Sequence, residues 1–405
     1  MVEKSNGNVK LCASSRCTGC TACMCICPTG SITMQENIWA ELHPVINKET
    51  CIRCGLCMKT CPQLQELNYN TALDCYAAWR INDSARMDSS SGGIAALLAE
   101  NVIKQRGVYY GVTFERNVGA HFTRIDKVND ISKTKGSKYV QASLNRVFEE
   151  IGHDLSCERK VVFVGSPCQV AGLQAYIANS RYSQYREKLL TVDFLCHGTV
   201  PQKYLLEYLD YVEKKHGCHI DYCVFRSNRP EENYYLTLIE QNHVCYKKKA
   251  ERDKYFYSFL KGITCRDSCI DCQFKSEKRV GDITIGDFIG LGRDSYFEFK
   301  NGINPSLVLV NTELGKTQIA TILNQGEFVP RPVEEAIKGG PSLKRETMTN
   351  CFRPTFKKHY VQGGFIQATL GLEMLMLVDE KTAKIKNVGR RCINKAKKVM
   401  KGQKQ

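Results

Sequence analysis

The chain has 405 residues, of which 43% are hydrophobic and 24% charged, a composition typical of a globular protein with buried cores. Its formal net charge is +15, but residues 381–405 hold ten Lys and Arg and no acid, which leaves +5 for the rest. The small net charge of the rest of the chain and the lack of a recognisable DNA-binding motif argue against nucleic-acid binding. No apolar run approaches the roughly 20 residues of a membrane span, and no secretory signal is recognisable, so we expect a cytoplasmic protein without a transmembrane segment.

Eight of the 22 cysteines form an internal repeat near the start of the chain. The stretches "CTGCTACMCICP" (17–28) and "CIRCGLCMKTCP" (51–62) share the spacing C-x2-C-x2-C-x3-C-P. Many cysteines without an export signal favour metal ligands over disulfides. Zinc bound by CxxC pairs would leave the third cysteine and the proline of each copy unexplained.

The repeat predicts two 4Fe-4S clusters, because this spacing is typical of bacterial two-cluster ferredoxins. In such a run the fourth cysteine ligates the other cluster. The expected ligands are Cys17, Cys20, Cys23 and Cys61 for one cluster, and Cys51, Cys54, Cys57 and Cys27 for the other. Cys12 and Cys25 stand outside the repeat and are expected to be bystanders.

After residue 67 the pattern alternates between helix and strand. Helices are expected over 93–106, 143–155, 169–178 and 201–216, and strands over 108–114, 160–164, 189–195, 224–226, 234–249, 283–285 and 307–310. The strands 160–164 and 189–195 flank a helix and should be parallel neighbours. We therefore expect a two-cluster ferredoxin-type domain (1–68), a mixed-sheet α/β domain (75–335) and an irregular to helical basic tail (338–405).

A second group of cysteines falls at one edge of the expected sheet. Cys168 follows strand 160–164 in a turn, and Cys196 and His197 follow strand 189–195, so all three lie at the carboxyl edge where such sheets bind ligands. The stretch "CRDSCIDCQF" adds Cys265, Cys269 and Cys272. These residues predict a four-thiolate site holding a third 4Fe-4S cluster, with zinc as the alternative. A Cys168–His197 nucleophile pair is the other interpretation, and it leaves the ferredoxin module without a purpose.

A flavin is the usual converter between single electrons and a two-electron substrate. The stretch "SSSGG" (89–93) begins a helix, where hydroxyl groups and free N–H groups can bind a pyrophosphate. The stretch "KGSKYVQ" adds Lys135 and Lys138 beside small residues. Serine capping of the helix is the alternative explanation.

Five motifs in order resemble the beta-subunit family of coenzyme F420 hydrogenases and dehydrogenases, over about residues 75–335. They are "SSGGIAALL", "GSKYVQ", "GSPCQVAG", "LCHG" and "CIDCQFKSEKRVGDITIGDFIG". The resemblance implies a flavin and iron–sulfur domain in which a 4Fe-4S cluster is bound by Cys168, Cys196, Cys269 and Cys272, with Cys265 surplus. It also implies an FAD lined by Ser90, Ser91, Gly92, Gly93, Lys138, Tyr139, Ser166 and Gln169.

We therefore expect an iron–sulfur flavoprotein oxidoreductase that passes electrons between ferredoxin-type clusters and FAD. Hydride exchange would follow with a small redox substrate, for which the deazaflavin coenzyme F420 is the candidate. The flavin carries the chemistry, so no catalytic side chain is expected, although His197 could donate a proton. The expected partner is a redox carrier protein or a partner enzyme subunit. The alternative function is a non-catalytic electron-transfer subunit linking ferredoxin to a partner enzyme.

Overall fold

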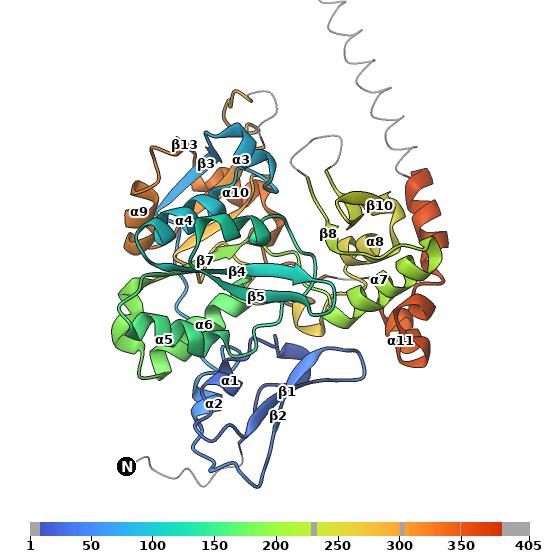
Figure 1. Cartoon of the computed structure of the whole chain (residues 1–405), viewed down its shortest axis with the longest axis horizontal. Helices are drawn as coiled ribbons and strands as arrows, with labels where there is room; N and C mark the ends of the chain where they lie inside the picture. Colours follow the sequence, from blue (N-terminus) through green and yellow to red (C-terminus); the bar gives the residue numbers. More distant parts are fainter. Residues whose placement is uncertain (1–8, 228–232, 300–303, 349, 383–405) are drawn as a thin grey trace, which may run out of the picture.

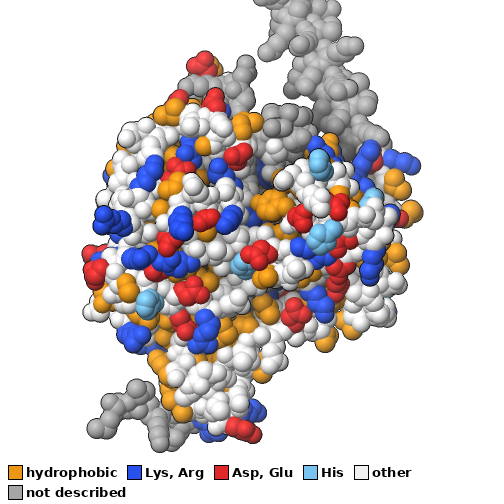
Figure 2. Space-filling view, in the orientation of Figure 1, with side chains coloured by type: hydrophobic (Ala, Val, Ile, Leu, Met, Phe, Trp, Pro, Cys, Tyr) orange, Lys and Arg blue, Asp and Glu red, His pale blue; other side chains and the backbone are white. Residues whose placement is uncertain are grey.

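The computed structural model describes residues 9–227, 233–299, 304–348 and 350–382. Within them a small N-terminal region lies against a central α/β domain, and a smaller lobe lies beside that domain (Figure 1). Charged side chains of both signs are scattered over the visible face of the α/β domain, whereas the N-terminal region shows mainly uncharged atoms (Figure 2). The ferredoxin-like region followed by a mixed α/β domain confirms the predicted fold class.

The N-terminal region is a two-fold repeat in structure as well as in sequence. Its elements are α1 (Ala22–Cys25), β1 (Ile32–Glu36), β2 (Leu42–Ile46) and α2 (Leu56–Lys59). Strands β1 and β2 pair antiparallel, and each short helix follows a residue with positive φ, Thr21 at 62° and Gly55 at 76°. The left-handed residue turns the chain back within each cysteine loop, so that neighbouring cysteines can face one space.

The central domain is built on an eight-stranded mixed sheet with the order β13-β3-β12-β11-β7-β6-β4-β5. The strands are β3 (Asp74–Arg80), β4 (Val108–Glu115), β5 (Gly119–Ile125), β6 (Val161–Gly165), β7 (Leu189–Phe194), β11 (Ile283–Asp287), β12 (Ser306–Val310) and β13 (Gly326–Pro330). Strands β4, β6, β7 and β11 are parallel neighbours, as predicted for β6 and β7. Their carboxyl ends therefore meet at one edge of the sheet.

Helices cover both faces of this sheet. They are α3 (Asp83–Met87), α4 (Ile94–Lys104), α5 (Val147–Ser156), α6 (Pro167–Asn179), α9 (Glu313–Ala320) and α10 (Val333–Gly339). Side chains alternate along β6, where Val161 and Phe163 pack with α5 and α6, and Val162 packs with α4. This alternation is the period-two pattern of a strand buried on both faces.

The smaller lobe joins a three-stranded antiparallel sheet to four helices. Its elements are α7 (Gln202–His216), β8 (Tyr222–Val224), β9 (Tyr235–Glu240), β10 (His243–Lys249), α8 (Lys254–Leu260), α11 (Arg353–Ala368) and a last helix, Leu372–Thr382. The segment after residue 338 is thus largely helical as far as residue 382. Residues 383–405, the last third of the predicted basic tail (338–405), lie outside the described residues.

No single helix among the described residues has both the length and the apolar character needed to cross a bilayer. A bent pair, Arg353–Ala368 with Leu372–Thr382, meets the length and composition criteria only when its two helices are taken together.

Two helices begin at other residues than the sequence pattern indicated. Helix α5 starts at Val147, because residues 143–146 run beside β5 and form a turn. Helix α6 starts at Pro167 and is capped by Ser166, so Cys168 lies in the first helical turn and not in the turn before it. Proline is favoured at such a first helical position, which explains the early start.

A buried ion pair joins β7 to the segment that follows the 265–272 cysteine stretch. Asp193 of β7 accepts a hydrogen bond from Arg279 (Oδ1 to Nη2, 2.8 Å), and both side chains are almost fully buried. Arg279 also donates to the carbonyls of Phe274 and Ser276, just after the last cysteine of the 265–272 stretch. The pair therefore fixes this stretch to the centre of the sheet.

We predict that Asp193→Ala destabilises the protein strongly, because it leaves the Arg279 charge buried and unpaired. Breaking such a pair costs about 3–5 kcal/mol, which should appear as a clear fall in Tm. The control is Asp210→Ala, which removes an exposed partner of Arg116 and should cost about 1 kcal/mol or less. Equal Tm values for the two variants would contradict the structural role of the buried pair.

Candidate metal and cofactor sites

The eight repeat cysteines divide between two cavities in the predicted sets of four. One, here called the proximal cavity, is lined by Cys17, Cys20, Cys23 and Cys61. The other, here called the distal cavity, is lined by Cys27, Cys51, Cys54 and Cys57. In each case three cysteines come from one copy of the repeat and the fourth from the other copy. This crossing is what the two-cluster ferredoxin pattern requires.

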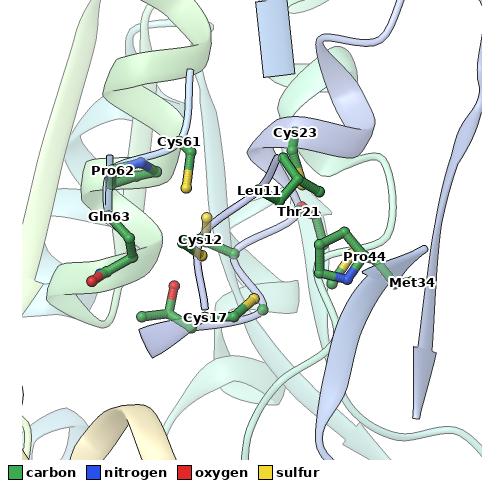
Figure 3. Close-up of a pocket in the computed structure, with 13 residues that line it drawn as sticks. Leu11, Cys12, Cys17, Thr21, Cys23, Met34, Pro44, Cys61, Pro62 and Gln63 are labelled. Atoms are coloured by element: carbon green, nitrogen blue, oxygen red, sulfur yellow. The ribbon is translucent and has the colours of Figure 1, made fainter. Parts of the chain in front are cut away.

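Cys12 also lines the proximal cavity, which the sequence pattern did not indicate. It lies between Cys61 and Cys17 (Figure 3), and hydrogen bonds with these two residues raise the pKa of the Cys12 thiol far above its usual range. Cys12 is therefore placed to donate a hydrogen bond to the neighbouring sulfur atoms. Cys25 lines neither cavity, and its buried thiol donates to Thr21 Oγ1 and the carbonyl of Asn145.

Hydrogen bonds around the proximal cavity favour a negative charge on Cys17. A hydrogen bond from Cys12 is the main cause of the lowered pKa of Cys17, and one from His43 adds to it. His43 lies 3.7 Å from the buried Glu41 (Nε2 to Oε2), and the bonds to Cys17 and then Glu41 raise its pKa to about 9. A thiolate at Cys17 is the ligand form that iron binds.

Four further cysteines, here called the third cysteine group, lie at the carboxyl edge of the central sheet: Cys168, Cys196, Cys269 and Cys272. Gly165 of β6 pairs with Asp193 of β7, so Cys168 and Cys196 emerge from adjacent strands. The loop after Cys196 touches Cys269, because a Cβ built on Gly198 would lie 3.5 Å from the Cβ of Cys269. Burial, then Cys196, and more weakly Cys272 and Cys269, raise the pKa of Cys168. The sequence-predicted set is thus brought together.

Cys265 differs from this group in its accessibility. Its exposed fraction is 1%, whereas each member of the third cysteine group is partly accessible. Its sulfur would lie 2.9 Å from a Cβ on Gly198, and its thiol donates weakly to the carbonyl of Phe259. Burial is the main cause of its raised pKa. A packed thiol of this kind fits the predicted surplus role.

Helix α6 joins the proximal cavity to the third cysteine group. Cys168 lies in its first turn, and Gly172, one turn later, packs directly on Cys20: a Cβ on Gly172 would lie 2.9 Å from both Cβ and Sγ of Cys20. Residues four apart on a helix lie about 5–6 Å from each other. One turn of α6 therefore separates Cys168, a member of the third cysteine group, from Gly172, which contacts Cys20 of the proximal cavity.

The two segments expected to line FAD meet in the structure. Ser90 Oγ accepts hydrogen bonds from the backbone N–H (2.8 Å) and the hydroxyl (2.9 Å) of Ser137. Gln169 links the start of α6 to the same region through a bond from Nε2 to the carbonyl of Ala142 (3.5 Å). The serine-rich helix start, the 136–142 segment and the 165–169 turn thus form one neighbourhood.

Lys138 is the residue of this neighbourhood that best fits an anionic group. Its ammonium donates to the carbonyls of Thr134 (2.9 Å) and Lys135 (2.8 Å). Among the described residues, no acid forms an ion pair with it. Burial lowers its pKa to about 7. A desolvated cation without an acidic partner is stabilised by a bound phosphate.

Other predicted FAD contacts already have partners within the protein. Ser91 and the backbone N–H of Gly92 both hydrogen-bond to Ser306 Oγ, at 2.9 Å each. A Cβ on Gly92 would lie 2.2 Å from the carbonyl oxygen of Ala78, so close packing alone requires a glycine there. Gln169 Oε1 accepts from the backbone and the hydroxyl of Ser166, completing the cap of α6.

Tyr139 also has a structural role. Its ring stacks on Phe259 with centroids 4.8 Å apart and packs near Phe225 and Phe256. Its carbonyl accepts a hydrogen bond from the hydroxyl of Tyr255 (2.8 Å). These contacts join the 136–142 segment to the smaller lobe.

The carboxyl edge of the sheet also holds a polar group that the sequence pattern did not single out. Arg226 donates to Asp287 at the end of β11 (Nη1 to Oδ2, 2.7 Å) and lies over the ring of Tyr234. Next to them, His197 Nδ1 lies 3.3 Å from Ser342 Oγ. Burial lowers the pKa of His197, so its ring is neutral at pH 7. Asp287 could have been identified from the sequence as a polar residue at the end of a buried strand. Its partner Arg226 could not, because no local pattern links the two residues.

Comparison with known proteins identifies the two parts of the chain. Residues 158–336 match the C-terminal family model of the coenzyme F420 hydrogenase/dehydrogenase beta subunit. Residues 16–64 and 43–107 each match a "4Fe-4S dicluster domain". Within the described residues, no three His, Cys, Asp or Glu side chains lie close enough together to bind one metal ion. The cysteine sets described above are therefore spaced more widely than the ligands of a single ion.

Two individual proteins are similar to this chain at low identity. A coenzyme F420-dependent sulfite reductase of Methanocaldococcus jannaschii is 23% identical over 223 residues, which are 51% of this chain and 34% of that protein. This chain thus spans about a third of the length of that relative. A chain of the F420-reducing [NiFe] hydrogenase complex from Methanosarcina barkeri is 15% identical with a TM-score of 0.47, covering 74% of this chain and 97% of that one.

We predict that Gly172→Val disrupts the proximal cavity selectively, because the new side chain meets Cys20 on a rigid helix. The purified protein should lose about four iron atoms per chain, one cluster's content, while keeping its circular dichroism. Ala178→Val, on an exposed position of the same helix, should keep all its iron. Full iron in Gly172→Val would show that α6 and Cys20 are not packed as described.

Proposed function

We propose that the chain is an iron–sulfur flavoprotein oxidoreductase, because residues 158–336 match the C-terminal family model of the coenzyme F420 hydrogenase/dehydrogenase beta subunit and residues 16–64 match a 4Fe-4S dicluster domain. It would pass electrons between its ferredoxin-type clusters and FAD and exchange hydride with a small redox substrate. The dicluster domain itself means that the chain binds two 4Fe-4S clusters and takes part in electron transfer.

The observation that carries this proposal is the closeness of the third cysteine group to the proximal cavity. Gln273, next to Cys272, donates to the carbonyl of Pro62, next to Cys61 (3.1 Å). The packing of Cys20 on α6 gives a second link between the two sites. Two cysteine sets joined in this way favour one electron path over two separate metal sites.

We assign the ligands of the dicluster domain to the two cavities, four cysteines to each. The third cysteine group would hold a third 4Fe-4S cluster, with Cys265 free. The pKa of each of its four thiols is raised, mainly because the surrounding protein disfavours the charged thiolate. Metal binding removes this cost, since a coordinated thiol is deprotonated.

FAD would supply the exchange between one-electron and two-electron chemistry. Lys138 and Ser90 would hold its phosphates, aided by the N–H groups at the start of α4, where Gly93 has φ of +81°. Gly92 would allow close packing against β3 without touching the cofactor. His197, next to the Arg226–Asp287 pair and with its pKa lowered by burial, could exchange a proton with a substrate at the sheet edge.

We propose a deazaflavin as the substrate class. The family description and the printed name of the M. jannaschii relative both refer to coenzyme F420. The match to that relative covers a third of its length, so sulfite reduction is not carried over to this chain.

An external redox protein or enzyme subunit would dock over the distal cavity. Ile52, between Cys51 and Cys54, has an exposed fraction of 61%, and Val45 of β2 nearby is also exposed. Exposed apolar side chains beside a redox centre suit the small contacts of transient electron-transfer partners. Electrons would then enter or leave at the end of the N-terminal region away from the sheet.

We predict that Cys168→Ala lowers the iron content by about four atoms per chain, because it removes one ligand of the third cluster. The electron paramagnetic resonance (EPR) signals of the two ferredoxin clusters should be kept. Cys265→Ala is the matched control and should keep full iron, since this buried thiol would bind no metal. Unchanged iron in Cys168→Ala, with loss of its reactivity towards alkylating reagents, would identify Cys168 as a free thiol.

We predict that Lys138→Gln releases flavin and leaves iron unchanged, because it removes the buried cation expected to bind phosphate. The measurement is flavin absorbance against iron in anaerobically purified protein. Lys135→Gln is the control, since Lys135 pairs with Asp88 and should keep its flavin. Wild-type protein without flavin, even after incubation with FAD, would favour an electron-transfer subunit without its own catalysis.

A further inference from the structure

A fully buried arginine lies between the proximal cavity and the third cysteine group. Arg266 has an exposed fraction of 0%. Its backbone N–H donates to the carbonyl of Thr199 (2.9 Å), and its own carbonyl accepts from the N–H of Cys269 (3.0 Å). The main chain of Arg266 is therefore part of the loops that carry Cys196 and Cys269.

The side chain of Arg266 leaves these loops and reaches the proximal cavity. Nη2 donates to the carbonyls of Cys17 (3.0 Å) and Leu42 (2.9 Å), and Nη1 donates to Gln141 Oε1 (2.7 Å). The Gln141 amide in turn donates to the carbonyl of Thr18 (3.1 Å). One residue thus has its backbone at one site and its guanidinium at the main chain of the other, so its charge lies within one side-chain length of both sites.

This charge has no acidic partner of its own among the described residues. All three hydrogen-bond acceptors of the guanidinium are neutral oxygens, and Nε has no partner. Two acids lie close by, Glu41 and Asp267, but Arg353 and Lys357 pair with both of them. Arg266, Arg353 and Lys357 thus share two acids, so positive charge exceeds negative charge here. His43, which also lies beside Glu41, adds to this excess when it is protonated.

The other fully buried arginine shows how such a charge is usually balanced. Arg279 donates to Asp193, and the pair is neutral. An unpaired buried charge is costly unless an anion compensates it. A 4Fe-4S cluster held by four thiolates carries a charge of about −2, so a cluster on either side of Arg266 would supply the missing negative charge.

We propose that Arg266 is the shared counter-cation of the proximal cluster and the third cluster, and that it raises the reduction potentials of both. Net charge near a cluster is one of the factors that set its potential. Adding an electron makes each cluster more negative, so a fixed positive charge between them stabilises the reduced forms. The part concerning the third cluster rests on the proposed function, whereas the part concerning the proximal cluster needs only the dicluster domain.

The test is an EPR-monitored redox titration of the anaerobically purified full-length protein and its Arg266→Gln and Arg266→Lys variants. In Arg266→Gln we expect at least a tenfold fall in the reduction equilibrium constant of two clusters, or about 59 mV for one electron. The distal cluster should keep its potential. Arg266→Lys keeps the charge and should stay close to the wild type. Arg116→Gln removes an arginine that pairs with two acids away from the cluster cysteines and should change no potential.

Several outcomes would overturn the proposal. Unchanged potentials in Arg266→Gln would show that its charge is not sensed, and equal shifts in the Gln and Lys variants would assign the effect to the shape of the guanidinium. Arg266→Gln could itself lose iron. In that case, an Arg266→Lys variant that keeps its iron and the wild-type potentials supports the proposal. Loss of iron in both variants would show that Arg266 only holds the two loops together and does not act through its charge. Wild-type protein with about eight irons would contradict the third cluster, yet the proximal cluster would still report on Arg266.

Discussion

Cysteines far apart in the sequence can serve one electron path only if the loops that carry them are held against each other. In this protein the holding contacts are hydrogen bonds to main-chain carbonyls of the N-terminal region. The carbonyls of Cys17 and Leu42 accept from Arg266, and that of Pro62 accepts from Gln273. Buried carbonyls need such partners, so the 265–273 loop completes the N-terminal region while joining it to the sheet.

The central sheet determines where the 265–273 loop meets the N-terminal region. Strands β6, β7 and β11 run parallel and end at one edge, which brings together Cys168, Cys196 and the Arg226–Asp287 pair. Arg279 then ties the 265–273 loop back to Asp193 of β7. The architecture thus brings thiols, a buried cation and a polar pair of side chains close together at one edge of the sheet.

Much of this arrangement could be predicted from sequence, because it depends on local spacing. The crossed sets of four cysteines follow from a repeat of 34 residues, and the positions of Cys168 and Cys196 follow from buried strands that end just before them. The start of α6 was missed by two residues, since Pro167 and Ser166 favour an earlier cap. Strands β3, β5 and β13 were not predicted. Cys12 was expected to be a bystander because it lies outside the repeat, yet it lines the proximal cavity. Arg226 and Arg266 could not be assigned, because their partners come from distant loops and no local pattern shows which charge remains unpaired.

Three clusters and a flavin share one chain in the function proposed for this protein. The most direct measurement is the content of iron, acid-labile sulfide and flavin per chain in wild-type protein purified without oxygen. The account predicts about twelve iron and twelve sulfide atoms, with one FAD. Zinc at the third cysteine group, or about eight irons and no flavin after reconstitution, would contradict it.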